Sequence, residues 1–381
     1  MKVLKSIMLY LKIVLYAKKK LFKPEKKDIL IFDSDLSDYL LKYFNREDVH
    51  VLDVRYRQKP GQKINLYVIL KMILTLKFSS TDYFKYYIGL VEPKIIITMI
   101  DNNKTFYKLK KLYPKAKTIL VQNAYRTAEK TDILSQTKEL KKDPSLFCDF
   151  ILVFNNYIGE LYKEFLRGEV ISIGSFRSNF NKKQNKKKKY EILFISIFRN
   201  HLPLKEEDFK LLKTINNYFS KNDKKLYVLG NMILNSDKEK MFYNSVLKDT
   251  NYTFIPREVS RPTYDIVDQS EIIITVESTL GYEALARKNK VAYFSIRGKS
   301  YPENTAAFGW PAKKNPRGPF WVNSTEYAEF GKLIEYLNNL RLDEYLKIYN
   351  ENASDLMEHD EDNTKFISLM KDLKIPLNQK L

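Results

Sequence analysis

The segment from Glu271 to Ser295, EIIITVESTLGYEALARKNKVAYFS, constrains the fold more than any other part of the sequence. Ile272 to Val276 is an almost wholly apolar, β-branched run, which is typical of a parallel strand buried on both faces. A short polar loop follows, and Leu280 to Lys288 then carries apolar residues at helical spacing. Val291 to Ser295 is apolar again and predicts the next strand. The segment therefore predicts a strand, loop, helix and strand of an α/β fold.

The loop of this unit has the residues of a phosphate site. In such a unit the exposed N–H groups and the positive end of the helix dipole face the carboxyl edge of the sheet, where open α/β folds bind ligands. Ser278 and Thr279 can donate hydroxyl hydrogen bonds, and Gly281 lets a ligand approach the backbone closely. Glu283, in the first turn, can accept hydrogen bonds from ribose hydroxyls. The alternative is that Ser278 or Thr279 caps the helix and Glu283 complements its dipole.

Composition narrows the class of protein. The 381 residues, of which 44% are hydrophobic, are enough for two domains with separate cores. The net charge of +20 implies an anionic partner, such as a membrane leaflet, a nucleic acid or a polyphosphorylated substrate. The sequence has no RRM, KH, zinc-finger or basic-zipper pattern, so nucleic acid is not an expected partner. A single cysteine, Cys148, and three scattered histidines predict no metal site.

The N-terminal segment, residues 1–27, is predicted to form a basic amphipathic helix. Lys5 and Lys12 interrupt its apolar run and no small-residue cleavage site follows, which argues against a transmembrane helix and a signal peptide. Two interpretations stay open. The helix lies in the membrane interface with Lys18 to Lys20 on anionic headgroups, or it packs on the protein as an ordinary amphipathic helix.

Strand and helix patterns alternate along the rest of the chain, which predicts two Rossmann-like βα lobes facing each other across a cleft, with C-terminal helices. The expected lobes are residues 28–178, on the acceptor side, and 191–350, on the donor side. Between them, 179–190 is rich in lysine and predicts a solvated linker, with a basic binding tract as the alternative. Residues 351–381 are expected to form a helix that packs back toward the first lobe.

Four stretches carry a family resemblance. The sequence resembles the O-antigen and surface-carbohydrate biosynthesis proteins that look like GT-B glycosyltransferases. The resemblance lies in VQNAYR at Val121 to Arg126, TVESTLGYEALARKNKVAYFS at Thr275 to Ser295, FGWP at Phe308 to Pro311 and GPFWVN at Gly318 to Asn323. It implies a cytoplasmic enzyme, without cofactor or metal, that transfers a sugar from a nucleotide-sugar donor to a glycan or lipid-linked acceptor. A peripheral position at the inner face of the membrane is compatible with such an acceptor.

The resemblance also implies roles for residues of the second lobe. It places the donor phosphates on Ser278 to Gly281 and the ribose near Glu283. The loop that contains Arg257 is expected to line the base pocket. Arg199, which follows the first strand of this lobe, is expected to neutralise the diphosphate leaving group, for which a permanently charged guanidinium is suited. A surface salt bridge is the alternative role for Arg199.

Glycosyl transfer also needs a general base for the acceptor hydroxyl. We expect this base at the strand ends of the first lobe, with Asp35 as the first candidate, then Asp33, then Asp101. Asn123 and Arg126 follow a third strand and are expected to position the acceptor. Each aspartate has an alternative role as a helix cap or turn residue.

Other functions remain compatible with parts of the sequence. The Asp33-Ser34-Asp35 triplet also matches a metal-binding D-x-D or the acid pair of a haloacid-dehalogenase phosphatase, although the residues after it do not fit the phosphatase pattern. A nucleotide-sugar 2-epimerase is the alternative enzyme, because it would use similar lobes and release a free sugar. Outside enzymes, the alternative is a basic, non-catalytic protein that binds nucleotide or membrane.

Overall fold

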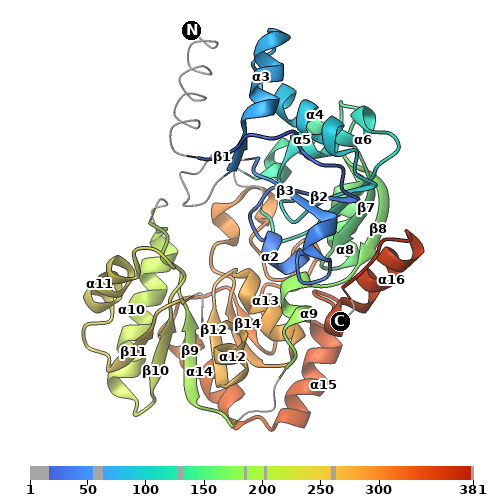
Figure 1. Cartoon of the computed structure of the whole chain (residues 1–381). Coiled ribbons are helices and arrows are strands. Elements are labelled where there is room, and N and C mark those ends of the chain that lie inside the picture. Colours follow the sequence, from blue (N-terminus) through green and yellow to red (C-terminus); the bar gives the residue numbers. More distant parts are fainter. Residues whose placement is uncertain are drawn as a thin grey trace. The chain divides into compact units, whose positions relative to one another are not determined.

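The computed structural model describes residues 17–54, 63–127, 132–183, 187–200, 204–258 and 263–378. The chain divides into two compact units (Figure 1). The first consists of residues 1–123, 137–177 and 363–381, and the second of 124–136 and 178–362. The chain therefore passes between the units four times, and neither is a single continuous segment.

The first unit is built on a six-stranded sheet in which every pairing is parallel. Its order is β3 (Val49–Leu52), β2 (Ile29–Phe32), β5 (Ile95–Thr98), β6 (Lys117–Val121), β7 (Phe147–Val153) and β8 (Arg167–Ser172). The sequences ILIF of β2 and IIIT of β5 are buried along their whole length, as expected for interior strands covered on both faces.

Short helices connect these strands. They are α2 (Ser37–Leu40), α3 (Leu66–Leu74), α4 (Ser80–Val91), α5 (Lys104–Tyr107), α6 (Leu109–Leu112), α7 (Thr137–Leu140) and α8 (Asn156–Lys163), with a 3-10 turn at Arg46–Asp48. Helix α16 (Thr364–Asp372) also belongs to this unit and follows all strands in the sequence, whereas the 3-10 turn Ile133–Gln136, between β6 and β7, belongs to the second unit. A capping box at Ser79 fixes the beginning of α4. Ser79 Oγ accepts from the N–H of Asp82 at 3.1 Å, and the Asp82 carboxylate accepts from the N–H of Ser79 at 3.3 Å, which makes a capping box for α4.

The N-terminal helix predicted for residues 1–27 lies largely outside the described residues. Within the described part, Lys18–Lys20 do not continue a helix. They form a short strand, β1, which pairs in parallel with β4 (Lys63–Asn65). The three lysines include no apolar residue that could pack a helix against the protein. Their backbone N–H and C=O groups form hydrogen bonds with β4 instead.

The second unit contains another wholly parallel sheet of six strands. Its order is β11 (Tyr252–Ile255), β10 (Leu226–Leu229), β9 (Tyr190–Ile195), β12 (Ser270–Thr275), β13 (Lys290–Phe294) and β14 (Trp321–Val322). In order of appearance this is 3-2-1-4-5-6, the strand order of the Rossmann fold. The helices are α10 (Glu206–Lys221), α11 (Ser236–Val246), α12 (Thr263–Asp268), α13 (Thr279–Ala286), α14 (Tyr327–Asn339) and α15 (Leu342–Asn352), with 3-10 turns at Gly298–Ser300, Pro302–Asn304 and Glu361–Asn363.

The lysine-rich segment predicted as a solvated linker is in part packed on the second unit. Asn179, at the end of α9 (Phe176–Phe180), is fully buried. Lys183 Nζ donates to the carbonyl oxygen of Arg287 at 2.6 Å, and Lys188 Nζ donates to the carbonyl oxygen of Asp268 at 2.9 Å. Composition alone predicted solvent exposure, but carbonyl groups at the ends of neighbouring elements bind these two ammonium groups.

Candidate active site

The second unit has a topological switch point between β9 and β12. The two strands are neighbours, but the connections that follow them lead to opposite sides of the sheet, so their carboxyl ends open a crevice where α/β folds bind ligands. The residues that follow β9 begin at Ser196, and those that follow β12 are Val276, Glu277 and Ser278. The segment singled out in the sequence therefore lies at this switch point.

Ser278 and Thr279 begin helix α13 and already make hydrogen bonds. Ser278 is the N-cap, and its Oγ accepts from the N–H of Leu280 at 3.2 Å. Thr279 Oγ1 accepts from the N–H of Tyr125 at 3.1 Å. The capping role considered from the sequence is thus real for Ser278. A hydroxyl that accepts a hydrogen bond keeps its own O–H, so both side chains retain a donor for a phosphate oxygen.

Tyr125 ties a distant segment to α13. Its ring stacks on that of Tyr282 with centroids 3.9 Å apart, and its hydroxyl donates to the carbonyl oxygen of Leu356. Residues 124–136 consequently belong to the second unit although the chain on both sides of them belongs to the first. Tyr125 is part of the VQNAYR stretch, so this contact joins two of the stretches that carry the family resemblance.

Gly281 serves a packing function that the sequence did not indicate. A Cβ atom at this position would lie 2.6 Å from Cγ2 of Thr275. The missing side chain therefore lets α13 pack closely on β12. The close approach of a ligand to the Gly281 backbone, which we expected from the sequence, stays a prediction.

Glu283 lies on the inner side of α13. Its side chain is only 2% exposed, so the protein encloses the carboxylate that we expected beside a ribose. A ribose contact of Glu283 stays a prediction.

Glu277 is a candidate that the sequence reasoning passed over. It has a left-handed backbone (φ 50°), is largely buried, and accepts from the N–H of Arg297 at 3.1 Å. Arg297 donates through Nε to Asp208 at 2.7 Å, while its Nη1 lies 3.7 Å from Glu277 Oε2. Burial raises the pKa of Glu277 to about 8, and Asp208 adds to the rise while Arg297 opposes it. An acidic residue directly after the switch-point strand was the signal that could have found it.

A buried carboxylate, Glu239, organises the neighbouring loops. It accepts from the hydroxyl of Ser196, from the N–H of Asn231 at 2.9 Å and from the N–H of Met232 at 3.0 Å. The loops after β9 and β10 are thereby held together. Arg199 lies exposed in the first of these loops, and Arg257, in the loop after β11, donates to the carbonyl oxygen of Asn231 at 3.4 Å. Both guanidinium groups belong to loops at the carboxyl edge of this sheet.

The first unit has its own switch point, between β2 and β5. Asp33 and Asp35 directly follow β2. Asp33 is buried, has φ 92° and accepts from the N–H of Asp35 at 3.0 Å, whereas Asp35 is half-buried. Asp35 is therefore the more accessible of the two carboxylates.

The other residues expected on the acceptor side have different surroundings. Asp101 follows β5 but is fully buried, and its carboxylate accepts from the hydroxyl of Tyr162 at 3.0 Å. Asn123 Nδ2 donates to the carbonyl oxygen of Met99 at 2.6 Å, which ties it to the loop after β5. Arg126, expected beside Asn123 on the acceptor, belongs to the second unit, where its Nη1 lies 3.8 Å from Asp132.

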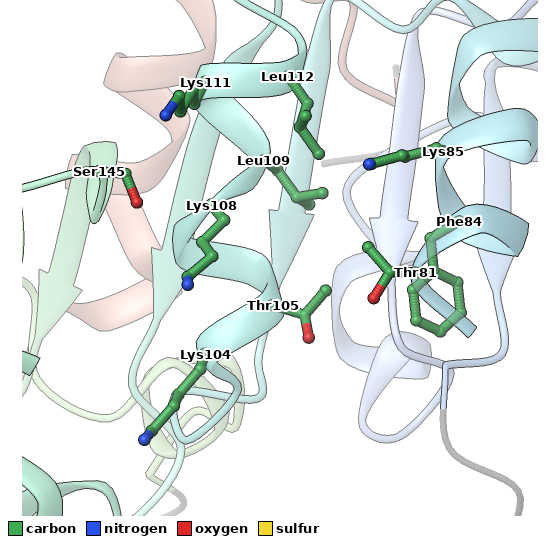
Figure 2. A pocket seen from close by; sticks show the side chains of 10 residues that line it. All are labelled: Thr81, Phe84, Lys85, Lys104, Thr105, Lys108, Leu109, Lys111, Leu112 and Ser145. Carbon is green, nitrogen blue, oxygen red and sulfur yellow. The ribbon is translucent and has the colours of Figure 1, made fainter. Parts of the chain in front are cut away.

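A cavity of about 500 Å³ lies between α4 and the α5–α6 pair of the first unit. Figure 2 shows Thr105, Leu109 and Leu112 on one wall and Thr81 and Lys85 on the other. Its remaining lining residues are Phe84, Lys104, Lys108, Lys111 and Ser145. Lys104 and Lys108 form ion pairs with Glu139 and Asp143, at 3.9 and 2.9 Å, which offsets part of the positive charge. The residues that directly follow β2 and β5 do not line this cavity, and no site is assigned to it.

Two features are absent from the described part of the chain. No group of three or more His, Cys, Asp or Glu residues there has an arrangement that would hold a metal ion. Among the described helices, none is long and apolar enough to cross a membrane.

A family model described as "putative O-antigen biosynthesis protein" matches residues 119–374, which is more than half of the chain. The chain belongs to this family. None of the curated proteins matches it in sequence.

Solved structures with the same fold include two that align over nearly the whole chain. The wall teichoic acid polymerase TagF is 13% identical, with a TM-score of 0.53 and 97% of both chains covered. A structure assigned to a UDP-N-acetylglucosamine 2-epimerase of Listeria monocytogenes is 12% identical, with a TM-score of 0.55, and covers 92% of this chain and 96% of its own. At this identity the likeness concerns the fold. The family member described here has the GT-B-like fold of two Rossmann-like lobes.

Proposed function

We propose that this protein is a glycosyltransferase that moves a sugar from a nucleotide-sugar donor to a surface-polysaccharide or O-antigen acceptor. The observation that carries the proposal is the position of α13. Its N-terminus, with the hydroxyls of Ser278 and Thr279, lies at the switch point of a sheet with Rossmann strand order. The O-antigen biosynthesis family of the chain supports a glycan as the acceptor.

The donor half of the reaction is proposed for the second unit. The diphosphate would bind at the N-terminus of α13, where the helix dipole and the two hydroxyls favour negative charge. Arg199 and Arg257 would supply cationic charge from the adjoining loops as the nucleotide departs. The ribose is proposed near Glu283. No metal is needed in this scheme, because fixed donors and guanidinium groups balance the charge of the leaving group.

The acceptor half is proposed for the first unit. Asp35 is the preferred general base, because it is the more accessible carboxylate at the switch point beside β2. Asp33, whose carboxylate fixes the turn, is the second candidate and Asp101 the third. Asn123 is proposed to position the acceptor; Arg126, which belongs to the second unit, is a further candidate for this role. With a lipid-linked acceptor, the enzyme would work at the cytoplasmic membrane surface.

The first test is ligand binding. We expect a nucleotide or nucleotide sugar to raise the melting temperature of the full chain, since a ligand at about 100 times its Kd adds ~2.7 kcal/mol of stability. Ser278→Ala should weaken that binding about tenfold, the loss expected when one hydrogen bond to a charged group is removed. The matched control is Ser79→Ala, which removes the N-cap hydroxyl of α4 at a similar cost of ~1 kcal/mol in stability. Equal nucleotide affinity in wild type and folded Ser278→Ala would refute the donor site.

The second test identifies the reaction. The protein is incubated with candidate nucleotide sugars and lipid-linked glycans, and products are read by mass. A glycan heavier by one sugar residue is expected. A free sugar released in the absence of acceptor would instead indicate a 2-epimerase, the alternative suggested by the fold shared with the Listeria structure.

A further inference from the structure

Helix α3 of the first unit is apolar on its outer face. Its sequence LYVILKMIL buries only Val68 and Met72. The large side chains at Tyr67, Leu70, Ile73, Leu74 and Leu76 are between 38% and 80% exposed. A helix that is hydrophobic on all sides is normally enclosed by protein or lipid. Figure 1 shows α3 projecting from the rest of its unit.

A second apolar segment adjoins this helix. Leu21 and Phe22 are 63% and 86% exposed. Asn65, the N-cap of α3, donates through Nδ2 to the carbonyl oxygen of Phe22 at 2.9 Å. The strand pairing between β1 and β4 holds the preceding lysines beside the strand that leads into α3. The two apolar segments therefore belong to one surface.

The two segments that form this surface carry only positive charge. Residues 17–24 and 63–81 contain no Asp or Glu, but they contain Lys18, Lys19, Lys20, Lys23, Lys63, Lys71 and Lys77. Acidic residues adjoin these ranges and are paired within the protein. Glu25 lies 3.4 Å from Lys27 and Glu92 lies 2.7 Å from Lys26. Asp53 accepts from the N–H of Lys63 at 2.8 Å, and Asp82 is held in the capping box of α4. Exposed aliphatic residues with a basic rim are the pattern of a segment that enters a membrane interface.

We propose that this α3 surface docks on an anionic lipid bilayer. The α3 surface comprises Leu21, Phe22, Tyr67, Leu70, Ile73, Leu74 and Leu76 with the seven lysines named above. The aliphatic and aromatic side chains enter the boundary between headgroups and acyl chains, and the ammonium groups contact lipid phosphates. This inference rests on the proposed function in one respect. A lipid-linked acceptor would be presented at the membrane, and this gives the enzyme a reason to bind there. The docking itself requires no transfer chemistry.

The test is co-sedimentation of the full chain with vesicles of phosphatidylglycerol and phosphatidylcholine, and with vesicles of phosphatidylcholine alone. We expect binding to the anionic vesicles that weakens as salt rises. The double variant Leu70→Ser, Leu74→Ser should bind at least tenfold more weakly. Both positions are exposed, so the fold is expected to survive, and circular dichroism checks it.

The matched control is Leu234→Ser with Met241→Ser. These residues belong to the second unit and are 77% and 70% exposed. Their replacement therefore removes exposed apolar surface of the same kind outside the α3 surface. Wild-type vesicle binding is expected for the control. A second variant, Lys19→Gln with Lys20→Gln, should reduce binding to anionic vesicles and leave the weak binding to phosphatidylcholine unchanged.

Three outcomes overturn the proposal. One is vesicle binding by the α3 variant equal to wild type. Another is loss of vesicle binding in the double variant Ile7→Ser, Leu11→Ser but not in the α3 variant, which would assign the membrane contact to residues 1–16. The third is a change from dimer to monomer in the α3 variant without a change in vesicle binding, which would show that a second copy covers α3. Binding is measured without donor or acceptor, so a protein that binds vesicles and transfers no sugar refutes only the proposed function.

Discussion

At the scale of single residues, the junction between β12 and α13 combines chemistry with tight packing. Glu277 and Arg297 share one buried cluster with Asp208, in which the arginine donates its shorter hydrogen bond to Asp208. Gly281 and Thr275 meet where the helix packs on the strand. Each of these contacts joins residues that lie far apart in the sequence or in different elements.

The first residue-scale prediction concerns pH. Burial raises the pKa of Glu277 to about 8 from a usual value of 4.5, so the folded protein holds this proton more tightly than the unfolded chain. The stability gained from the protonated group is complete below pH 4.5 and is lost as pH rises through about 8. In Glu277→Gln, the free energy of unfolding from urea titrations should depend less on pH in this window. The exposed control Glu335→Gln should keep the wild-type profile, and a wild-type profile in Glu277→Gln would contradict the prediction.

The second concerns Gly281. Its replacement by alanine should destabilise the protein by ~1–3 kcal/mol, because the new Cβ would overlap Thr275 and force α13 away from β12. Adding Thr275→Ala should recover part of the loss in denaturant unfolding. The matched control is Gly89→Ala in α4, where no atom lies within 4 Å of the new Cβ; there alanine should stabilise the helix by ~0.5–1 kcal/mol. Equal effects at the two glycines would refute the packing argument.

At the scale of elements, Arg287 fastens the end of α13 to its neighbours. Its guanidinium is fully buried and forms a bidentate pair with Asp268, at the end of α12, with Nε to Oδ1 at 3.0 Å. Its Nη1 donates to the carbonyl oxygens of Ser178 and Asn181, at 3.0 and 2.6 Å. One side chain thus joins two helices and the segment that enters the second unit.

Replacing Arg287 with methionine should therefore cost ~3–5 kcal/mol in the free energy of unfolding, because the Asp268 carboxylate would stay buried without its guanidinium partner. The double variant Arg287→Met, Asp268→Asn should be less destabilised than the single one, since the uncompensated charge is gone. The exposed neighbour Lys288→Ala should stay within about 0.5 kcal/mol of wild type. A double variant as unstable as the single one would show that the charge pair is not the cause.

At the scale of the whole molecule, the chain passes repeatedly between its two units. Residues 124–136 leave the first unit for the second, and residues 363–381 return from the second to the first. In the returning segment Asn363 Nδ2 donates to the hydroxyl of Tyr43 at 2.8 Å, and Phe366 lies 5.3 Å from the Tyr43 ring and 5.0 Å from that of Phe176. The end of the sequence is therefore part of the core built by its beginning.

Phe366→Ala should for this reason destabilise the first unit, by ~3–5 kcal/mol, and leave the second largely unaffected. Hydrogen exchange resolved along the chain would show faster exchange in β2 and β5 than in β9 and β12. Lys371→Ala, exposed on the same helix, should change neither unit. Equal acceleration in both units would mean that they unfold together.

The alternation of strands and helices is predictable from local patterns in the sequence. β-Branched apolar runs such as ILIF and IIIT, and apolar residues at helical spacing, are local patterns, so the α/β class and the strand, loop and helix around Ser278 could be predicted. The sequence also located the polar residues that follow the strands. The physical reason is that burial on both faces selects such residues whatever the rest of the chain does.

Which of these polar residues are accessible depends on the tertiary structure. Asp101 and Glu283 are polar residues near strand or helix ends, as predicted, but both are enclosed by protein. Tyr125 reaches Thr279 across more than a hundred and fifty residues, and Lys18–Lys20 become a strand because Lys63–Asn65 lie beside them. Accessibility and partnership depend on segments distant in sequence, which no local pattern encodes.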